Sequence, residues 1–233
     1  MSPVPPAPET SGPADGFRPT SGWCAPEVAQ ELPGLRLLVT EAQVRRAGSP
    51  TGAAPPDLLA RLRELSNRMR GATAVAVRSQ PVPAAYRVFF RHIGLDPDVV
   101  RTPIEDAVLE RMLRGGFLSG GLLQDALRIA LLDTGVPVWA LDARAVEGPL
   151  GIRASVAGER LGRSQHAPHL PAGRLVVADV ASPLAVLFGA LAPGHEAGGR
   201  TRQVVLFAVQ VAGVPDLYAE EALWNCRAAL ERR

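Results

Sequence analysis

The chain has 233 residues, of which 47% are apolar and 21% are charged, so it has enough apolar mass for a hydrophobic core and intrinsic disorder of the whole chain is excluded. The longest nearly apolar run, residues 204–214, is about half of the roughly 20 residues that a membrane span needs. The N-terminal residues have neither the basic start nor the apolar block of a secretory signal, and Cys24 and Cys226 alone imply no disulfide framework. We therefore expect a cytoplasmic protein with no membrane partner.

The net charge is only +2, but all 25 cationic residues are arginines. Residues 57–92 are distinctly basic, because seven arginines there face only Asp57 and Glu64. Guanidinium groups suit phosphate recognition, and such binding weakens steeply with salt. Charge alone therefore nominates a nucleic-acid-binding set, with a solvated helix face as the alternative. The six arginines of this set are Arg61, Arg63, Arg68, Arg70, Arg87 and Arg91.

The first part of the chain predicts a tail, a strand and two helices. Residues 1–22 are rich in proline and poor in large apolar side chains, so we expect a disordered tail followed by one domain over residues 23–233. A first strand is predicted near residues 35–39. Asp57 begins a helix with apolar residues at helical spacing, which Gly71 ends; residues 73–77 form a short run rich in β-branched residues, and Pro83 begins a second helix that closes at Gly94.

The rest of the chain predicts two more helices, then strands, then a closing helix. Thr102, Pro103 and Glu105 have the spacing of a capping box, so a helix begins there and ends at Gly115. Another helix is expected over residues 122–134, and Asp216 begins the last one. Short runs bounded by Gly, Pro or Asp predict strands within residues 136–142, 150–156, 174–180, 183–189 and 202–211. The expected fold class is α+β, or mixed α/β.

No familiar catalytic or cofactor signature is present, so no cofactor is expected. His166 and His169 are spaced for metal ligation, but the Ala-Pro between them disfavours the helix that would align both rings, and no metal is assigned. His195 and Glu196 lie in a glycine-rich loop, where they are either an acid–base pair or two residues of an exposed loop. Catalytic residues stay unassigned.

A collinear set of short motifs in the C-terminal two-thirds of the chain resembles the B3/B4 module of the bacterial phenylalanyl-tRNA synthetase beta subunit, and the upstream segment 85–105 resembles the free-standing B3/B4 proteins. The resemblance covers nearly everything after Trp23. Each motif alone is weak, and the order and spacing carry the match. The matching positions are Asp125, Gly135 to Pro137, Trp139 to Asp142, Gly148, Ile152, Arg153, Gly158 to Leu161, Leu175 to Asp179, Leu184 and Ala185.

The resemblance implies a domain with a central cleft that hydrolyses tyrosine wrongly esterified to tRNA. The family's cleft histidine corresponds to Trp139, its tyrosine-reading glutamate to Phe207, and a glycine that gives the substrate room to Gly189. With the two polar groups replaced, selection of tyrosine through its hydroxyl should be lost, because an apolar pocket discriminates far less than a hydrogen-bonding one.

Three functions stay open at this level. The first is a free-standing module that binds tRNA or the aminoacyl end of a charged tRNA, without DNA as a partner. The second is an aminoacyl-tRNA ester hydrolase acting in trans with an apolar specificity. The third is a small-molecule module that holds an amino acid in the cleft, with a merely solvated arginine face.

Overall fold

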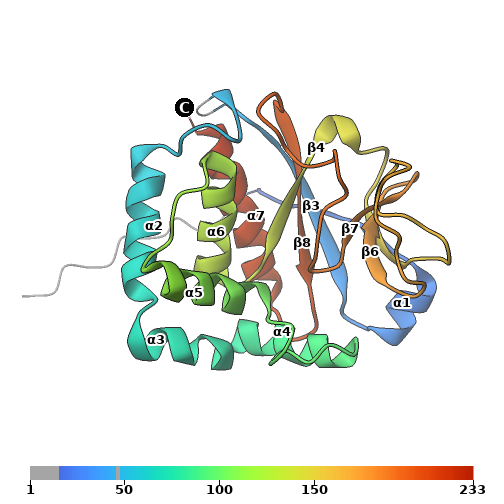
Figure 1. Ribbon diagram of the computed structural model, residues 1–233, viewed down its shortest axis with the longest axis horizontal. Coiled ribbons are helices and arrows are strands. Elements are labelled where there is room, and N and C mark those ends of the chain that lie inside the picture. Colours follow the sequence, from blue (N-terminus) through green and yellow to red (C-terminus); the bar gives the residue numbers. More distant parts are fainter. Residues whose placement is uncertain (1–15, 46–47, 233) are drawn as a thin grey trace, which may run out of the picture.

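The computed structural model describes residues 16–45 and 48–232, and it is a mixed α+β structure, as the sequence predicts. Seven α-helices lie in this part of the chain together with two four-stranded sheets. Figure 1 shows most of the helices on one side of the first sheet, and the second sheet with the short helix of residues 26–31 on its other side.

The first sheet has the strand order β1-β3-β8-β4, and all its pairs are antiparallel. One of its two long central strands lies in a nearly continuous apolar run, residues 204–211, all of which are buried. A strand buried on both faces needs such a run, because neither side meets water. The bounds of its strands are β1 Thr20–Ser21, β3 Arg36–Gln43, β4 Val138–Asp142 and β8 Gln203–Gln210.

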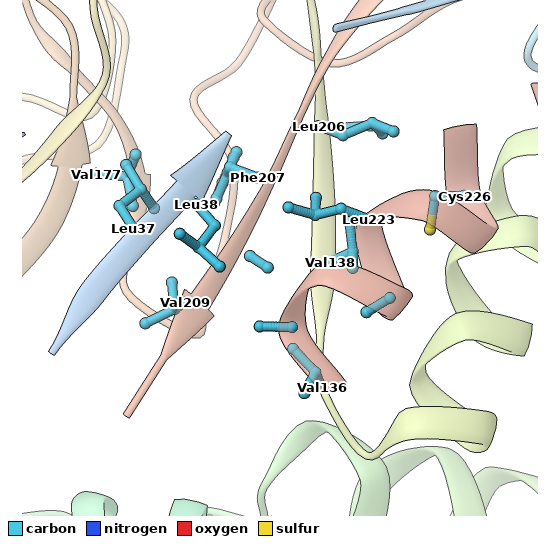
Figure 2. Packing of buried hydrophobic residues seen from close by; sticks show 14 of the residues in the cluster. Leu37, Leu38, Val136, Val138, Val177, Leu206, Phe207, Val209, Leu223 and Cys226 are labelled. Carbon is cyan, nitrogen blue, oxygen red and sulfur yellow. The ribbon is translucent and has the colours of Figure 1, made fainter. Parts of the chain in front are cut away.

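The second sheet has the order β2-β5-β6-β7, in which β2 pairs parallel with β5 and the other pairs are antiparallel. Four short strands form it: β2 Trp23–Cys24, β5 Gly151–Ala154, β6 Leu175–Ala178 and β7 Pro183–Val186. Gly151 is required where β2 meets β5, since a Cβ there would lie 2.0 Å from the ring of Trp23. The main core fills both faces of the first sheet, and Figure 2 shows Leu37 beside Val177 of the second sheet, whereas Leu206 and Val138 lie on the side of α7.

Most of the helices form the remaining layer, which contains a second, smaller apolar core. That core joins α2, α3, α5 and α6 through residues such as Leu65, Ala74, Val108 and Ile129. Helix α5 begins at the predicted capping box, where the Glu105 carboxylate accepts hydrogen bonds from the backbone N–H of Thr102 at 3.1 Å and from its hydroxyl at 2.6 Å. The helices are α1 Pro26–Glu31, α2 Pro56–Arg68, α3 Gly71–Ala76, α4 Pro81–His92, α5 Pro103–Arg114, α6 Leu122–Thr134 and α7 Asp216–Glu231.

Two local predictions were wrong. Residues 71–76, which hold most of the run rich in β-branched residues, form helix α3, because Ala74 and the following Val77 are buried in the helical core. Gly71 therefore does not end a helix; its positive φ of 52° turns the chain into a new one. Helices α2 and α4 begin one and two residues before the predicted starts, each at a proline, whose fixed φ suits a first helical turn, whereas α7 begins at Asp216 as predicted.

The predicted boundary of the N-terminal tail was also wrong. Residues 1–15 lie outside the described residues, but residues 20–21 form β1, paired with β3 at Leu38 and Val39. Phe17 packs against Trp224 with ring centroids 5.3 Å apart. Ordered structure thus begins before Trp23, because one aromatic side chain and two ladder positions suffice to anchor the segment.

A bidentate ion pair beside β5 makes stability depend on acidity. Arg153 donates to both carboxylate oxygens of Glu159, at 2.9 and 2.5 Å, and this pairing lowers the pKa of Glu159. A lowered pKa in the folded state means that the unfolded chain binds the proton more readily, so this stabilisation is present above the ordinary glutamate pKa and is lost as the pH falls below it. We expect the free energy of unfolding to fall less between about pH 6 and pH 3 in Glu159→Gln than in the wild type, as measured by urea denaturation; equal falls would contradict the assignment.

Candidate functional site

The positions that the resemblance assigns to the cleft face each other on neighbouring strands. Trp139 of β4 and Phe207 of β8 are directly opposite in the antiparallel ladder. Their rings are stacked, with centroids 5.6 Å apart and planes 11° apart. Phe207 is 1% exposed and Trp139 is half-buried at the edge strand. Figure 2 places Phe207 among the buried side chains of the sheet. This pair is apolar on both sides.

Phe188 completes the apolar filling between the sheets. Its ring lies 5.8 Å from Trp139, and 5.3 to 5.7 Å from three aromatic residues of α4. It has a φ of 58°, the only positive φ of a non-glycine residue in the described part of the chain. A bulky residue in this region is strained, and the surrounding rings hold it there. We call these residues the aromatic cluster: Tyr86, Phe89, Phe90, Trp139, Phe188 and Phe207.

Gly189 follows Phe188 in the turn after β7. Its N–H donates to the carbonyl of Val186 at 2.8 Å, and a Cβ at Gly189 would lie 3.1 Å from the Val186 side chain. The close approach to Val186 accounts for the glycine without a ligand. Its role in giving a substrate room stays a prediction.

His195 and Glu196 lie beside the end of β4, yet they have different surroundings. His195 is 7% exposed, with its Nδ1 3.3 Å from the carbonyl of Pro193, and its own carbonyl accepts a hydrogen bond from Asp142 N–H at 2.9 Å. Glu196 is exposed, and its carboxylate accepts from Gly194 N–H at 2.8 Å. Because one side chain is buried and the other turns back on its own loop, this conformation does not join them as an acid–base pair.

The aromatic cluster offers little hydrolytic chemistry. Its one titratable group is Tyr86, whose hydroxyl donates to the carbonyl of Val209 at 2.8 Å. Complete burial raises the pKa of Tyr86 well above its ordinary value, so it stays protonated. Across residues 16–45 and 48–232, no group of three or more His, Cys, Asp or Glu side chains is arranged to hold a metal ion.

Three of the six nominated arginines are used within the fold. Arg61 and Arg68 both reach Asp133 of α6, at 2.7 and 3.1 Å. Arg87 is 11% exposed and binds Glu105 at 2.5 Å and Asp98 at 2.6 Å. These guanidinium groups join helices together, so they contribute less to an external ligand than their count in the sequence indicates.

The other three arginines are exposed. Arg63 forms no ion pair with the described residues, and Arg70 donates to Asn67 at 2.6 Å. Arg91 forms no close ion pair in the described structure; the pKa of Asp98 is lowered first by its hydrogen bond with Arg87 and, to a smaller extent, by the charge of Arg91. Arg63 and Arg70 belong to the α2 end of the helical layer and Arg91 to α4, with α3 between these helices in Figure 1. The six residues therefore do not form one continuous row of free charges.

Phe188 is the site residue that the sequence did not single out. Its sequence neighbours Leu187 and Gly189 suggest a strand end, and the positive φ belongs to the phenylalanine rather than to the glycine. No sequence pattern marks a non-glycine residue that tertiary contacts force into the left-handed region.

The site and the fold together define a mixed α+β domain whose inter-sheet space is closed by aromatic side chains. No family model matches the chain. It is similar to part of the phenylalanine–tRNA ligase beta subunit: 40% identical over 68 residues to that of Xanthomonas oryzae pv. oryzae (strain MAFF 311018) and 31% identical over 119 residues to that of Streptomyces avermitilis. The two matches cover 29% and 49% of this chain but only 8% and 14% of the relatives' length. No described helix is long and apolar enough to cross a membrane.

Proposed function

We propose that this chain is a tRNA-binding module related to part of the phenylalanine–tRNA ligase beta subunit, and that it does not hydrolyse tyrosyl esters. The observation that carries the proposal is the local similarity to that subunit, over up to 119 residues. The aromatic cluster supports the absence of tyrosyl-ester hydrolysis, because the apolar rings of Trp139 and Phe207 occupy the positions where the resemblance implies a histidine and a glutamate.

The exposed arginines supply the RNA contact in this proposal. Arg63, Arg70 and Arg91 are the members of the nominated set that are not held in ion pairs within the described structure. Lysine is absent from the sequence, so phosphate contacts fall to guanidinium groups, which bind phosphate oxygens in a bidentate manner.

The salt dependence of tRNA binding tests the proposal. We expect filter binding of total tRNA to weaken linearly on a logarithmic scale with salt, with a slope of about 0.7 to 0.9 per neutralised phosphate. The triple variant Arg63→Gln/Arg70→Gln/Arg91→Gln should bind more weakly, with a slope shallower by about 2 to 3.

A matched triple variant removes the same charge elsewhere. Arg18 and Arg36 form surface ion pairs with residues of α7, and Arg232 directly follows that helix. Arg18→Gln/Arg36→Gln/Arg232→Gln should leave the slope close to that of the wild type. Absence of tRNA binding at low salt, or an equal loss in both variants, would contradict the proposed surface.

Measuring the release of amino acid from charged tRNA tests whether the protein lacks ester hydrolysis, as proposed. The wild type should release no tyrosine from mischarged tRNA, since the aromatic cluster holds neither a positioned base nor a group free to bind the tyrosine hydroxyl. Release of any amino acid above the rate without protein would instead favour an ester hydrolase with an apolar specificity.

A further inference from the structure

A pocket between α3 and α5 lies outside the aromatic cluster. Its walls lie within residues 74–78, 97–101 and 105–112, together with Arg87 of α4, and we call it the α3–α5 pocket. In Figure 1 the three helices lie at the lower end of the helical layer. The pocket has a volume of about 350 Å³, which is within the usual size range of small-molecule sites.

One part of the lining is apolar and open to water. Val75 of α3 and Met112 of α5 line the pocket although they are 64% and 56% exposed. Val77 and Val108 also line it and belong to the buried core of the helical layer, so this wall is fixed by packing. A ligand that covers Val75 and Met112 gains free energy, because it removes apolar surface from water.

Two guanidinium groups line the same pocket without a carboxylate partner. Arg78 and Arg101 are both exposed, and neither forms an ion pair within the described part of the chain. The surroundings are positive: the pKa of Asp98, another lining residue, is lowered first by its hydrogen bond with Arg87 and then by the charges of Arg87, Arg91 and Arg78. An anion bound beside Arg78 and Arg101 would supply the charge that they lack.

Two carboxylates complete the lining and limit which anion fits. Asp98 and Glu105 both bind Arg87, at 2.6 and 2.5 Å, and Glu105 also accepts hydrogen bonds from Thr102. Asp98 is 63% exposed, and its Oδ2 accepts no hydrogen bond from the described residues. Because a free carboxylate oxygen accepts from hydroxyl or amino groups, a matching ligand carries such donors besides its negative charge.

We propose that the α3–α5 pocket binds one unpaired nucleotide of RNA, with the phosphate at Arg78 and Arg101, a ribose hydroxyl at Asp98 and the base against Val75 and Met112. A nucleotide combines an anion, hydroxyl donors and a flat apolar face, and an unpaired one leaves that face accessible. The inference rests on the proposed function and names a part of the RNA. Neither arginine belongs to the six that charge along the sequence nominates.

Calorimetric titration of the full chain with adenosine 5′-monophosphate tests the site. The comparison ligands are adenosine, inorganic phosphate and 3-phenylpropionate, an organic acid with an apolar body. We expect the nucleotide to bind at least about tenfold more tightly than each of them, since each lacks the charge-assisted bonds, the apolar contact or the ribose hydroxyls. Equal affinity for the nucleotide and any of the three, or no heat from the nucleotide at millimolar concentration, would overturn the proposal.

Three variants locate the binding. Arg78→Gln/Arg101→Gln removes two exposed and unpaired charges, so it should unfold at the same urea concentration as the wild type and bind the nucleotide about tenfold or more weakly. Met112→Glu places a carboxylate in the apolar wall and should abolish binding. The matched control Arg144→Gln/Arg200→Gln changes two exposed arginines that line a different hollow and should bind as the wild type does. Undiminished binding in Arg78→Gln/Arg101→Gln would overturn the proposal.

Filter binding of total tRNA by the same variants separates this inference from the proposed function. Arg78→Gln/Arg101→Gln should weaken tRNA binding and make the salt slope shallower by about 1, since one phosphate loses its contacts. If tRNA binds the wild type but the nucleotide does not, the α3–α5 pocket is not the RNA contact and the proposed function stands. If the nucleotide binds but tRNA does not, the proposed function fails and the placement of the nucleotide stands.

Discussion

Replacing Phe207 by glutamate is expected to abolish or nearly abolish folding at room temperature. Phe207 is 1% exposed, stacks on Trp139 and is flanked by Val39 in the ladder. Removing a buried phenylalanine destabilises by about 3 to 5 kcal/mol, and an unpaired buried carboxylate adds several more. Together these approach the roughly 5 to 15 kcal/mol that holds a typical domain folded. Urea denaturation followed by circular dichroism measures the loss.

Two control variants show whether the loss of stability comes from burying a charge at position 207. Phe207→Leu keeps the site apolar and should lose only about 1 to 2 kcal/mol. Leu217→Glu changes an apolar residue of α7 that is 56% exposed and should be nearly neutral. If Phe207→Glu lowered the free energy of unfolding by less than about 1 kcal/mol, the space between the sheets would be a hydrated cleft able to hold a carboxylate. That result would contradict the proposal that the protein does not hydrolyse tyrosyl esters.

The same argument limits how editing chemistry can be restored. A Trp139→His/Phe207→Glu variant returns the two groups that the resemblance implies, but it also places a carboxylate at position 207, where the native side chain is only 1% exposed. If this double variant released no tyrosine, the cause would be unfolding of the protein, and the result would say nothing about the chemistry of the restored groups. Trp139→His alone, at a half-buried edge position, is the informative single change, because the imidazole there keeps access to water.

Replacing Arg87 by methionine is expected to lower the free energy of unfolding by about 3 kcal/mol. Methionine keeps much of the volume but leaves Glu105, itself only 12% exposed, without its ion-pair partner. Asp98 is 63% exposed and adds little, since water solvates it when Arg87 is absent. Thermal and urea unfolding at neutral pH measure the loss.

A second change separates the ion pair from simple packing. Arg87→Met/Glu105→Gln removes the stranded carboxylate and should recover part of the stability, whereas Arg91→Met, one turn further along α4 and exposed, should be nearly neutral. Equal losses in the single and double variants would show that Arg87 acts through packing of its side-chain stem and not through its charge.

This result bears on the arginine-rich segment as a whole. A variant that replaces all six nominated arginines would lose Arg87 and the contacts of Arg61 with Asp133, so weaker tRNA binding would be confounded by lost structure. The exposed arginines alone test the RNA surface. The sequence shows that the segment is basic, but it does not show which charges already have partners.

The helices with strong local signals were predictable to within a residue or two. The capping residues Thr102 and Glu105 and the glycines after α5 and α6 fix their ends by short-range sterics and hydrogen bonds. The strands of the C-terminal half were equally readable from their apolar runs. The run at residues 73–77 was not, since its residues serve either a strand or a short helix and only packing against α5 and α6 decides.

The candidate site likewise has some features that the sequence predicts and others that only tertiary contacts decide. The apolar replacements at Trp139 and Phe207 are evident from the resemblance, and so is the inference that a hydroxyl-reading pocket is lost. Their stacking, and the position of Phe188 in contact with both Trp139 and α4, follow from strand register and from a strained backbone, which involve residues far apart in the chain.

By itself, the sequence determined the α+β class, most element boundaries, the basic character of residues 57–92 and the absence of a familiar catalytic motif, because composition, periodicity and capping act over a few neighbouring residues. Only the tertiary structure decided that Arg61, Arg68 and Arg87 are joined to carboxylates, that His195 is buried away from the Glu196 carboxylate, and that aromatic rings fill the space between the sheets. Such pairings depend on distance in space, which the order of residues along the chain does not fix.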